Sequence, residues 1–268
     1  MYLIDKISLS LMNQYPKKQL GQNFLIDKNI ITKIIHLIEP EVEDVILEIG
    51  PGKGALTRYL AQMAKSLIAV EKDKGLIYDL NKDIPDAQFI LMDALTFPWH
   101  RANGYFTKIV GNLPYNIATT LIFDIVAHFS RGKLMVFMVQ KEVAEKICAK
   151  PGDKKFGVLS AWIQTFCDVK ADIIIKPTCF YPRPKVLSQV ILLIPKKIEL
   201  NKNTQEKLKK TIKTCFNNPR KQLKTILKNR WNSDLDDFFK KNKIREDARP
   251  NMLTPEQYLQ LAETIYKK

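Results

Sequence analysis

The stretch Leu47-Glu48-Ile49-Gly50-Pro51-Gly52-Lys53-Gly54 joins an apolar run to a segment of helical character. Residues 45–49 have the length and apolar content of a short buried strand, and residues 55–64 have the spacing of a helix. Glycines between a strand and a helix let the backbone turn sharply and let a ligand approach it closely. The spacing here is GxGxG, which differs from the GxGxxG of dinucleotide sites. The stretch therefore predicts a ligand-binding loop at the carboxyl end of a strand.

Strand-like and helix-like segments alternate around this loop, from about residue 29 to residue 140. The expected strands are 45–49, 66–71, 88–92, 108–111 and 133–139. The expected helices are 29–39, 55–64, 73–81 and 119–129. Alternation at this spacing predicts βαβ units in a mostly parallel sheet, with helices on both of its faces.

The remainder of the chain changes character near Pro195. Before that residue we expect helices at 141–148 and from about 157, an extended proline-rich loop at 176–184, and strands at 171–175 and 186–194. After it only helical patterns occur, at 204–216, 220–230, 234–241 and 255–267. The fold class is thus predicted as α/β, a Rossmann-like domain (1–195) whose mostly parallel sheet has seven strands, followed by a small all-α domain (196–268).

The charge of the chain is distributed unevenly. Lysine and arginine number 43 and aspartate and glutamate 28, a net charge of +15, of which +10 lies between Lys196 and Lys268. Such asymmetry indicates a polyanionic partner, nucleic acid or an anionic membrane surface, and we favour nucleic acid. A lysine-rich surface that serves only solubility is the alternative.

Membrane insertion and a disulfide framework are not expected. No run of 18 or more apolar residues occurs, and the first residues lack the layout of a signal peptide. The four cysteines are scattered and form no CxxC pair, which argues against zinc knuckles and favours a reducing cytoplasm.

Four successive expected strands end in residues suited to an adenosyl ligand. These residues are Gly50, Glu71, Asp93 and Asn112. A carboxylate at Glu71 can accept both ribose hydroxyls, and one at Asp93 can accept from an adenine amine. NAD is the rival ligand, but its pyrophosphate needs the helix N-terminus that GxGxxG provides. S-adenosylmethionine has no phosphate, and its positive groups suit acids and backbone carbonyls.

These motifs together resemble the ribosomal RNA adenine dimethyltransferases, which are class I methyltransferases. The resemblance runs from about Lys17 to the end of the chain and rests on ordered motifs at 17–25, 48–54, 70–73, 93–95 and 112–116. Motifs at 139–147, 150–152 and 180–186, with 219–223 and 249–256 in the tail, resemble the small-subunit branch, the KsgA/Dim type. Two positions depart from the family pattern, which usually has glycine at Met92 and aspartate at Leu187.

The resemblance makes the turn Asn112-Leu113-Pro114-Tyr115-Asn116 the expected catalytic segment. The Asn112 side-chain oxygen and the Leu113 carbonyl could accept from an adenine N6 amine, and Pro114 adds rigidity. Tyr115 could stack on the base. Turn chemistry alone, with Asn116 capping the next helix, is the simpler interpretation of this stretch.

Further site residues follow from the same resemblance. Phe180 would form the second wall of the base slot, although core packing of this aromatic ring is nearly as good an interpretation. The segment before the first helix would close over the methionine moiety through Gln22, Asn23 and Leu25, or would be an ordinary helix N-terminus. The expected RNA-binding residues are Lys209, Lys210, Lys213, Arg220, Lys221 and Lys224. We expect no metal.

The family implies transfer of methyl groups from S-adenosylmethionine to N6 of two adjacent adenines near the 3′ end of 16S rRNA, with S-adenosylhomocysteine as product. The expected partner is a pre-30S particle, and the expected state is a cytoplasmic monomer. The alternatives are a large-subunit rRNA methyltransferase that confers macrolide resistance, a non-catalytic assembly or transcription factor on the same fold, and a dehydrogenase.

Overall fold

The computed structural model describes residues 22–267 and contains a seven-stranded sheet of order β4-β3-β2-β5-β6-β9-β7. Strands β2 to β6 are parallel to one another, whereas β9 is antiparallel to both β6 and β7. The strands are β2 (Val45–Ile49), β3 (Ser66–Glu71), β4 (Ala87–Leu91), β5 (Lys108–Asn112), β6 (Leu134–Gln140), β7 (Cys167–Ile175) and β9 (Ser188–Pro195). The predicted fold class, including the seven-stranded and mostly parallel sheet, is confirmed.

Helices cover both faces of the sheet because alternate strand residues point to opposite sides. In β2, Ile46 belongs to a hydrophobic cluster with α2, α3 and α4, whereas Leu47 and Ile49 belong to a second cluster with α5, α6 and α7. The bounds of these helices are α2 (Lys28–Ile38), α3 (Thr57–Met63), α4 (Lys74–Asp83), α5 (Ala118–Val126), α6 (Lys141–Ile147) and α7 (Val158–Phe166). Short 3₁₀ turns, η2 (Ala94–Thr96) and η3 (Trp99–Arg101), join β4 to β5.

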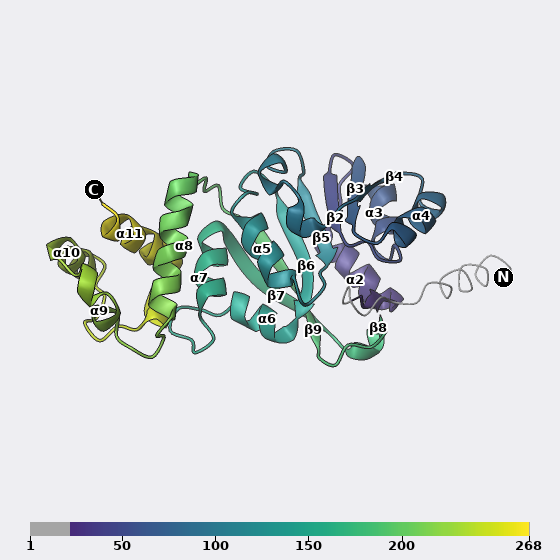
Figure 1. Ribbon diagram of the computed structural model, residues 1–268. Helices are drawn as coiled ribbons and strands as arrows, with labels where there is room; N and C mark the ends of the chain where they lie inside the picture. The colour runs from purple at the N-terminus through teal and green to yellow at the C-terminus, as the bar shows by residue number, and fades with distance from the viewer. Residues whose placement is uncertain (1–21, 268) are drawn as a thin grey trace.

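The helical C-terminal part packs at the end of the molecule opposite β3 and β4 (Figure 1). Its elements are α8 (Lys202–Phe216), α9 (Leu223–Ile226), η5 (Lys228–Arg230), α10 (Ser233–Lys241), η6 (Pro250–Met252) and α11 (Pro255–Ile265). Leu208 and Ile212 of α8 and Tyr258 of α11 are buried in the same cluster as Trp162 of α7. The hydrophobic core is therefore continuous across the junction that follows Pro195, and the division of the chain into two domains remains a prediction.

Local capping explains where several helices begin. The Asp27 side chain accepts hydrogen bonds from the Asn29 and Ile30 amides at the start of α2. The Asn201 side chain likewise accepts a hydrogen bond from a backbone amide at the start of α8. Thr254 and Gln257 form a capping box at the start of α11. Such caps satisfy backbone donors that have no partner inside the helix.

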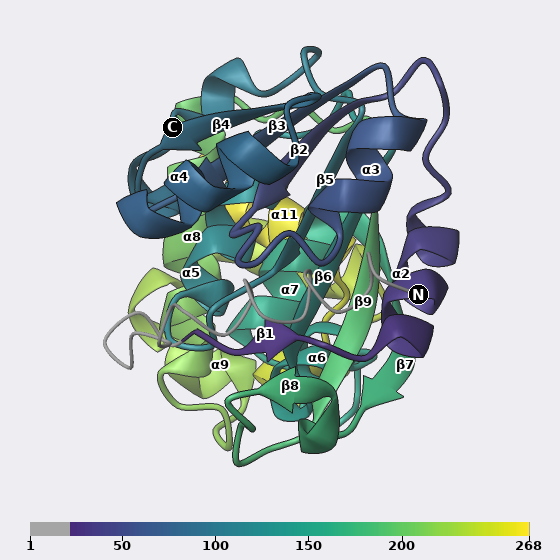
Figure 2. The ribbon, with the colours of Figure 1, turned by 90° about the vertical axis from the view of Figure 1, so that its right-hand side faces the viewer.

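A two-stranded ribbon was not expected from the sequence. β1 (Phe24–Leu25) pairs antiparallel with β8 (Phe180–Tyr181), and the two strands lie next to one another in Figure 2. The segment 176–184 was expected to be an extended loop, but it contains β8 and a 3₁₀ turn, η4 (Pro177–Cys179). A pairing across about 155 residues leaves no local pattern, so only the tertiary structure reveals it.

Three local expectations were wrong. Asn116 does not cap α5, because Pro114 O accepts from both the Ile117 and Ala118 amides and the helix begins without a side-chain cap. The helix expected at 220–230 is a single short helix, α9, followed by η5. Strand β7 begins at Cys167, directly after α7, rather than at residue 171. Within residues 22–267, no helix is long and apolar enough to cross a membrane.

Candidate active site

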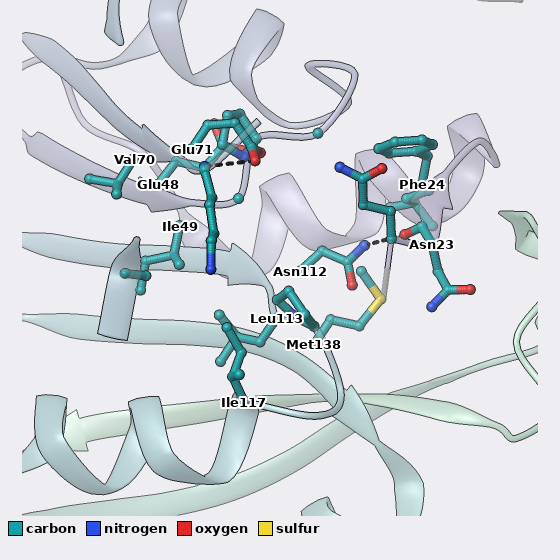
Figure 3. Close-up of a pocket in the computed structure, with 18 of the residues that line it drawn as sticks. Asn23, Phe24, Glu48, Ile49, Val70, Glu71, Asn112, Leu113, Ile117 and Met138 are labelled. Carbon is teal, nitrogen blue, oxygen red and sulfur yellow. Dashed lines mark hydrogen bonds between the residues drawn. The ribbon is translucent and has the colours of Figure 1, made fainter. Parts of the chain in front are cut away.

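A cavity lies beyond the carboxyl ends of β2, β3, β4 and β5, where ligands bind in open α/β sheets (Figure 3). Gly50, Glu71, Asp93 and Asn112, each expected from a different strand end, all line it. Parallel strands with their observed register bring these four positions to one rim. The structure therefore brings together the residues that the sequence singled out for an adenosyl ligand.

The glycine loop combines left-handed backbone with close packing. Gly50 and Gly52 have φ angles of +67° and +58°, a conformation that side chains disfavour. A Cβ at Gly52 would lie 2.9 Å from the Phe24 ring, whereas the nearest atom to a Cβ at Gly50 is 3.9 Å away. Gly52 thus lets β1 pack on the loop, and Gly50 leaves room for a ligand against the backbone.

Gly111 lets two strands of the rim approach one another closely, a role that the sequence analysis missed. A Cβ at this position would lie 2.6 Å from the Ile49 carbonyl oxygen, so β5 can approach β2 at the cavity only without a side chain there. The signal that could have revealed it was a glycine inside an otherwise apolar strand.

Glu71 is held as an acceptor by the backbone that follows it. Its Oε1 accepts hydrogen bonds from the Lys72 and Asp73 amides, at 2.8 and 2.9 Å. The side chain is buried, and burial raises the pKa of the carboxyl above its usual value. Two fixed donors on one oxygen orient the carboxylate, so a ligand hydroxyl meets a preorganised acceptor.

Asp93 has a cationic partner that the sequence analysis did not identify. Lys72 Nζ lies 2.7 Å from Asp93 Oδ2, while Oδ1 accepts from the Leu95 amide. The hydrogen bond from Lys72 lowers the pKa of Asp93. An adenine amine that bound to Asp93 would therefore be a further donor to a carboxylate that already accepts from Lys72. Met92, which departs from the family pattern, also lines the cavity.

Asn112 is oriented by a contact from the other side of the cavity. Its Nδ2 donates to the Asn23 carbonyl oxygen at 2.8 Å, and Figure 3 shows the two residues facing one another. Because the amide nitrogen is used in this way, the side-chain oxygen is the end presented to a substrate amine. The Leu113 amide donates to Met138 O at 3.2 Å, which anchors the turn to β6.

Tyr115 is fixed by a hydroxyl contact with the last strand. Its OH lies 2.6 Å from Ser188 Oγ, and burial of the half-buried ring raises the pKa of the phenol. Pro114 and Tyr115 both line the cavity, next to Asn112. A planar base entering beside Asn112 would therefore meet an aromatic ring of fixed position.

Phe180 does not lie on the cavity wall in this structure. Its side chain is 1% exposed and packs in a hydrophobic cluster with Leu25, on the ribbon β1–β8. The core-packing interpretation describes its observed place. The exposed neighbour on the ribbon is Tyr181, at 53%.

The segment before α2 lies where the sequence analysis expected it. Gln22, Asn23 and Leu25 all line the cavity, and Gln22 Nε2 donates to Asp73 Oδ2 at 3.3 Å. The motif residues 17–21 lie outside the described residues. Lys53 Nζ lies 5.3 Å from the centre of the Phe24 ring, a further contact between this segment and the glycine loop.

Glu48 is a cavity residue to which the sequence analysis gave no role. It is 2% exposed, lines the cavity and lies beside Glu71. Burial raises the pKa of its carboxyl to about 7. An acid within the apolar strand 45–49, two residues before the glycine loop, was the available signal.

The six basic residues expected to bind RNA are all exposed on α8 and around α9. Aromatic rings support three of them: Lys209 lies over Phe123, Lys210 over Tyr266 and Lys224 over Trp231, at 5.1–5.7 Å from the ring centres. Within residues 22–267, no group of three or more His, Cys, Asp or Glu side chains could hold a metal ion.

Comparisons with known proteins agree with this geometry. The family model for ribosomal RNA adenine dimethylase matches residues 13–267. The ribosomal RNA small subunit methyltransferase A of Oleidesulfovibrio alaskensis is 41% identical over 257 residues, which cover 93% of this chain and 91% of that protein. The protein of the same name from Maridesulfovibrio salexigens is also 41% identical, over 93% of this chain and 95% of its own length.

Two solved structures are similar to this chain over most of its length. A dimethyladenosine transferase from Plasmodium falciparum has a TM-score of 0.73 and 27% identity, covering 89% of this chain and 95% of its own. The 23S rRNA methyltransferase ErmE has a TM-score of 0.70 and 25% identity, covering 91% of this chain and 99% of its own.

Proposed function

The chain belongs to the ribosomal RNA adenine dimethylase family, and from that premise we propose that it dimethylates two adjacent adenines at N6 near the 3′ end of 16S rRNA, with S-adenosylmethionine as methyl donor. The choice of the small subunit is supported by the relatives, since those at 41% identity are named for the small subunit. The 23S rRNA methyltransferase is 25% identical and is the basis of the second candidate, methylation of the large subunit.

The cavity fits an adenosyl cofactor by the chemistry of its donor set. The open backbone at Gly50 would lie against the ligand, the oriented carboxylate of Glu71 would accept ribose hydroxyls, and Asp93 would accept the adenine amine. When bound, S-adenosylmethionine supplies an electrophilic methyl group on a sulfonium. Gln22, Asn23 and Leu25 would cover the remainder of the ligand.

The observation that carries the proposed chemistry is the orientation of Asn112. An adenine N6 amine is a weak nucleophile because its lone pair is delocalised into the ring. The Asn112 side-chain oxygen, held in place by the Asn23 carbonyl, and the Leu113 carbonyl would accept its two hydrogens and favour a pyramidal nitrogen. Prepositioned acceptors of this kind lower the barrier without reorganising during the reaction. The proton lost after methylation passes to solvent, so no strong base is required.

The target base must leave its stack to reach Asn112, and stacking on Tyr115 would offset part of that cost. Phe180 could form a second wall only if the ribbon β1–β8 moves, since its ring is buried in the observed state. The exposed lysines and Arg220 of the C-terminal part would bind the RNA backbone. We propose that the protein acts in the cytoplasm as a monomer on a pre-30S particle and without a metal.

The decisive experiment is nucleoside mass spectrometry of unmethylated small and large subunits incubated with the protein and labelled S-adenosylmethionine. Labelled N6,N6-dimethyladenosine in the small-subunit RNA is the expected result. Label confined to the large subunit would overturn the proposed substrate in favour of the second candidate. Absence of label from both, with the cofactor bound, would favour a non-catalytic role on the same fold.

A further inference from the structure

Glu48 is a buried acid that has no part in the proposed contact with the ribose or in the proposed binding of the target amine. It lies in β2 between Leu47 and Ile49, where its neighbours across the sheet are Ala69 and Val110. Its side chain forms part of the cavity wall, and Figure 3 shows it close to Glu71. A carboxyl group in such a place is costly to ionise unless a cation or several donors compensate it.

The surroundings of Glu48 do not provide that compensation. Its Oε2 and the Thr57 Oγ1 from α3 are buried and, within residues 22–267, make no well-formed hydrogen bond. The nearby Thr57 hydroxyl lowers the pKa of Glu48, but burial outweighs it. The neighbouring charge from β3 is the carboxylate of Glu71, which has the same sign and raises the pKa of Glu48 further. No ion pair to Glu48 occurs in the described part of the chain.

The other elements near Glu48 contribute little charge on its side of the sheet. Helix α2 contributes buried isoleucines to the hydrophobic cluster that contains Ile46 of β2: Ile31, Ile34, Ile35 and Ile38. The cations at the cavity are Lys53 of the glycine loop and Lys72, which is paired with Asp93. Burial lowers the pKa of Lys53, and Asp79 opposes that shift.

Building on the proposed function, we propose that Glu48 is the positioning residue through which the cavity distinguishes a sulfonium from a thioether. Below neutral pH the carboxyl is protonated in the empty cavity and ionises when S-adenosylmethionine binds, its O–H bond breaking and its proton passing to the buffer. The resulting carboxylate attracts the cationic cofactor. The product, S-adenosylhomocysteine, has no charge on sulfur and lacks this attraction, so product release is favoured.

The sign of the pH dependence follows from linkage. With a pKa of about 7 in the empty cavity, Glu48 is mostly neutral below neutral pH. A bound cation lowers that pKa, so the bound state holds fewer protons than the empty state and affinity for the sulfonium falls as pH falls. The dissociation constant of S-adenosylmethionine therefore rises by up to about tenfold for each unit by which pH falls below the pKa of the empty cavity. That of S-adenosylhomocysteine changes much less.

The test is calorimetric binding of both ligands to the full chain at about pH 6.5, in two buffers of different ionisation enthalpy. S-adenosylmethionine should release at least about half a proton more from the wild-type protein than from Glu48→Gln, since glutamine mimics the neutral acid and cannot titrate. The comparison with the variant is needed because the α-amino group of the ligand itself titrates near pH 8. Glu43→Gln, which changes an exposed acid just before β2, is the matched control and should behave as wild type.

The outcomes separate this inference from the proposed function. If S-adenosylmethionine binds both proteins with equal proton release and equal pH dependence, Glu48 has only a structural role and the inference is wrong. If S-adenosylmethionine does not bind the wild-type protein at all, the proposed function fails as well. Thermal unfolding of Glu48→Gln shows whether the variant keeps the fold, and the difference in proton release between S-adenosylmethionine and S-adenosylhomocysteine on the wild-type protein, both of which carry the same α-amino group, tests the inference without the variant.

Discussion

The cavity rim and the ribbon β1–β8 form two sides of the same site, and they are built in different ways. The rim consists of the ends of adjacent parallel strands, whose register places Gly50, Glu71 and Asn112 together. The ribbon joins two short strands far apart in the chain, and its aromatic residue Phe180 faces the core. The strand register therefore fixes the rim, whereas under the proposed function the ribbon would have to move to enclose a base.

The largest expected effect is on the rim. Asn112→Ala should keep cofactor affinity but reduce single-turnover methylation by about 10²–10³-fold, because it removes one preorganised acceptor for the target amine. Asn81→Ala, which changes an exposed amide on α4 away from the cavity, is the control and should be nearly neutral. Unchanged turnover in Asn112→Ala would contradict the proposed grip on the amine.

The second effect tests whether the ribbon moves. Phe180→Leu should lower kcat/KM for the RNA about tenfold through lost stacking on the base, with cofactor affinity unchanged. The equally buried Phe129, in the other hydrophobic cluster, provides the matched variant Phe129→Leu. Both variants should lose about 1 kcal/mol of stability in denaturant unfolding. If their kinetics are also alike, Phe180 is only a core residue.

A third prediction concerns the contact between the rim and the last strand. Tyr115→Phe removes the hydrogen bond to Ser188, worth about 0.5–1.5 kcal/mol, and should lower kcat/KM for the RNA about three- to tenfold. Ser188→Ala should have a similar effect. A double-mutant cycle measures the coupling, and strictly additive losses would show that this hydrogen bond does not position the ring.

The smallest effect lies far from the cavity, on α8. Lys210→Gln should reduce the slope of log K against log salt for RNA binding by about 0.7, the value for one phosphate contact on a single strand. Lys33→Gln, an exposed lysine on α2, is the control and should leave the slope unchanged. Filter binding at several salt concentrations measures both slopes, and equal slopes would remove Lys210 from the RNA interface.

The parts predicted from the sequence are those whose signal is local. Strands β2 and β3 were expected with their observed bounds, because each is a short apolar run between turn residues. Glu71 and Asn112 were expected at the rim because parallel strands in a βαβ order bring their carboxyl ends together. The resemblance to the family added the roles of the turn 112–116, which no spacing rule supplies.

The parts that were missed depend on contacts between distant segments. Nothing near Asp93 in the sequence states that Lys72 will pair with it, and nothing near Phe180 states that its strand will pair with Phe24–Leu25. The cap expected at Asn116 failed for a local reason instead, since the backbone carbonyl of Pro114 was a competing acceptor.

The sequence by itself determined the strand–helix order, the turn chemistry of the glycine loop and the basic character of the tail, since hydrophobic period, glycine content and charge are properties of neighbouring residues. The tertiary structure decided which groups face one another: Asn112 with the Asn23 carbonyl, Tyr115 with Ser188, and Glu48 with Glu71 and no cation. Hydrogen-bond direction and the cost of burying a charge depend on what surrounds an atom in space, and only the folded chain defines those surroundings.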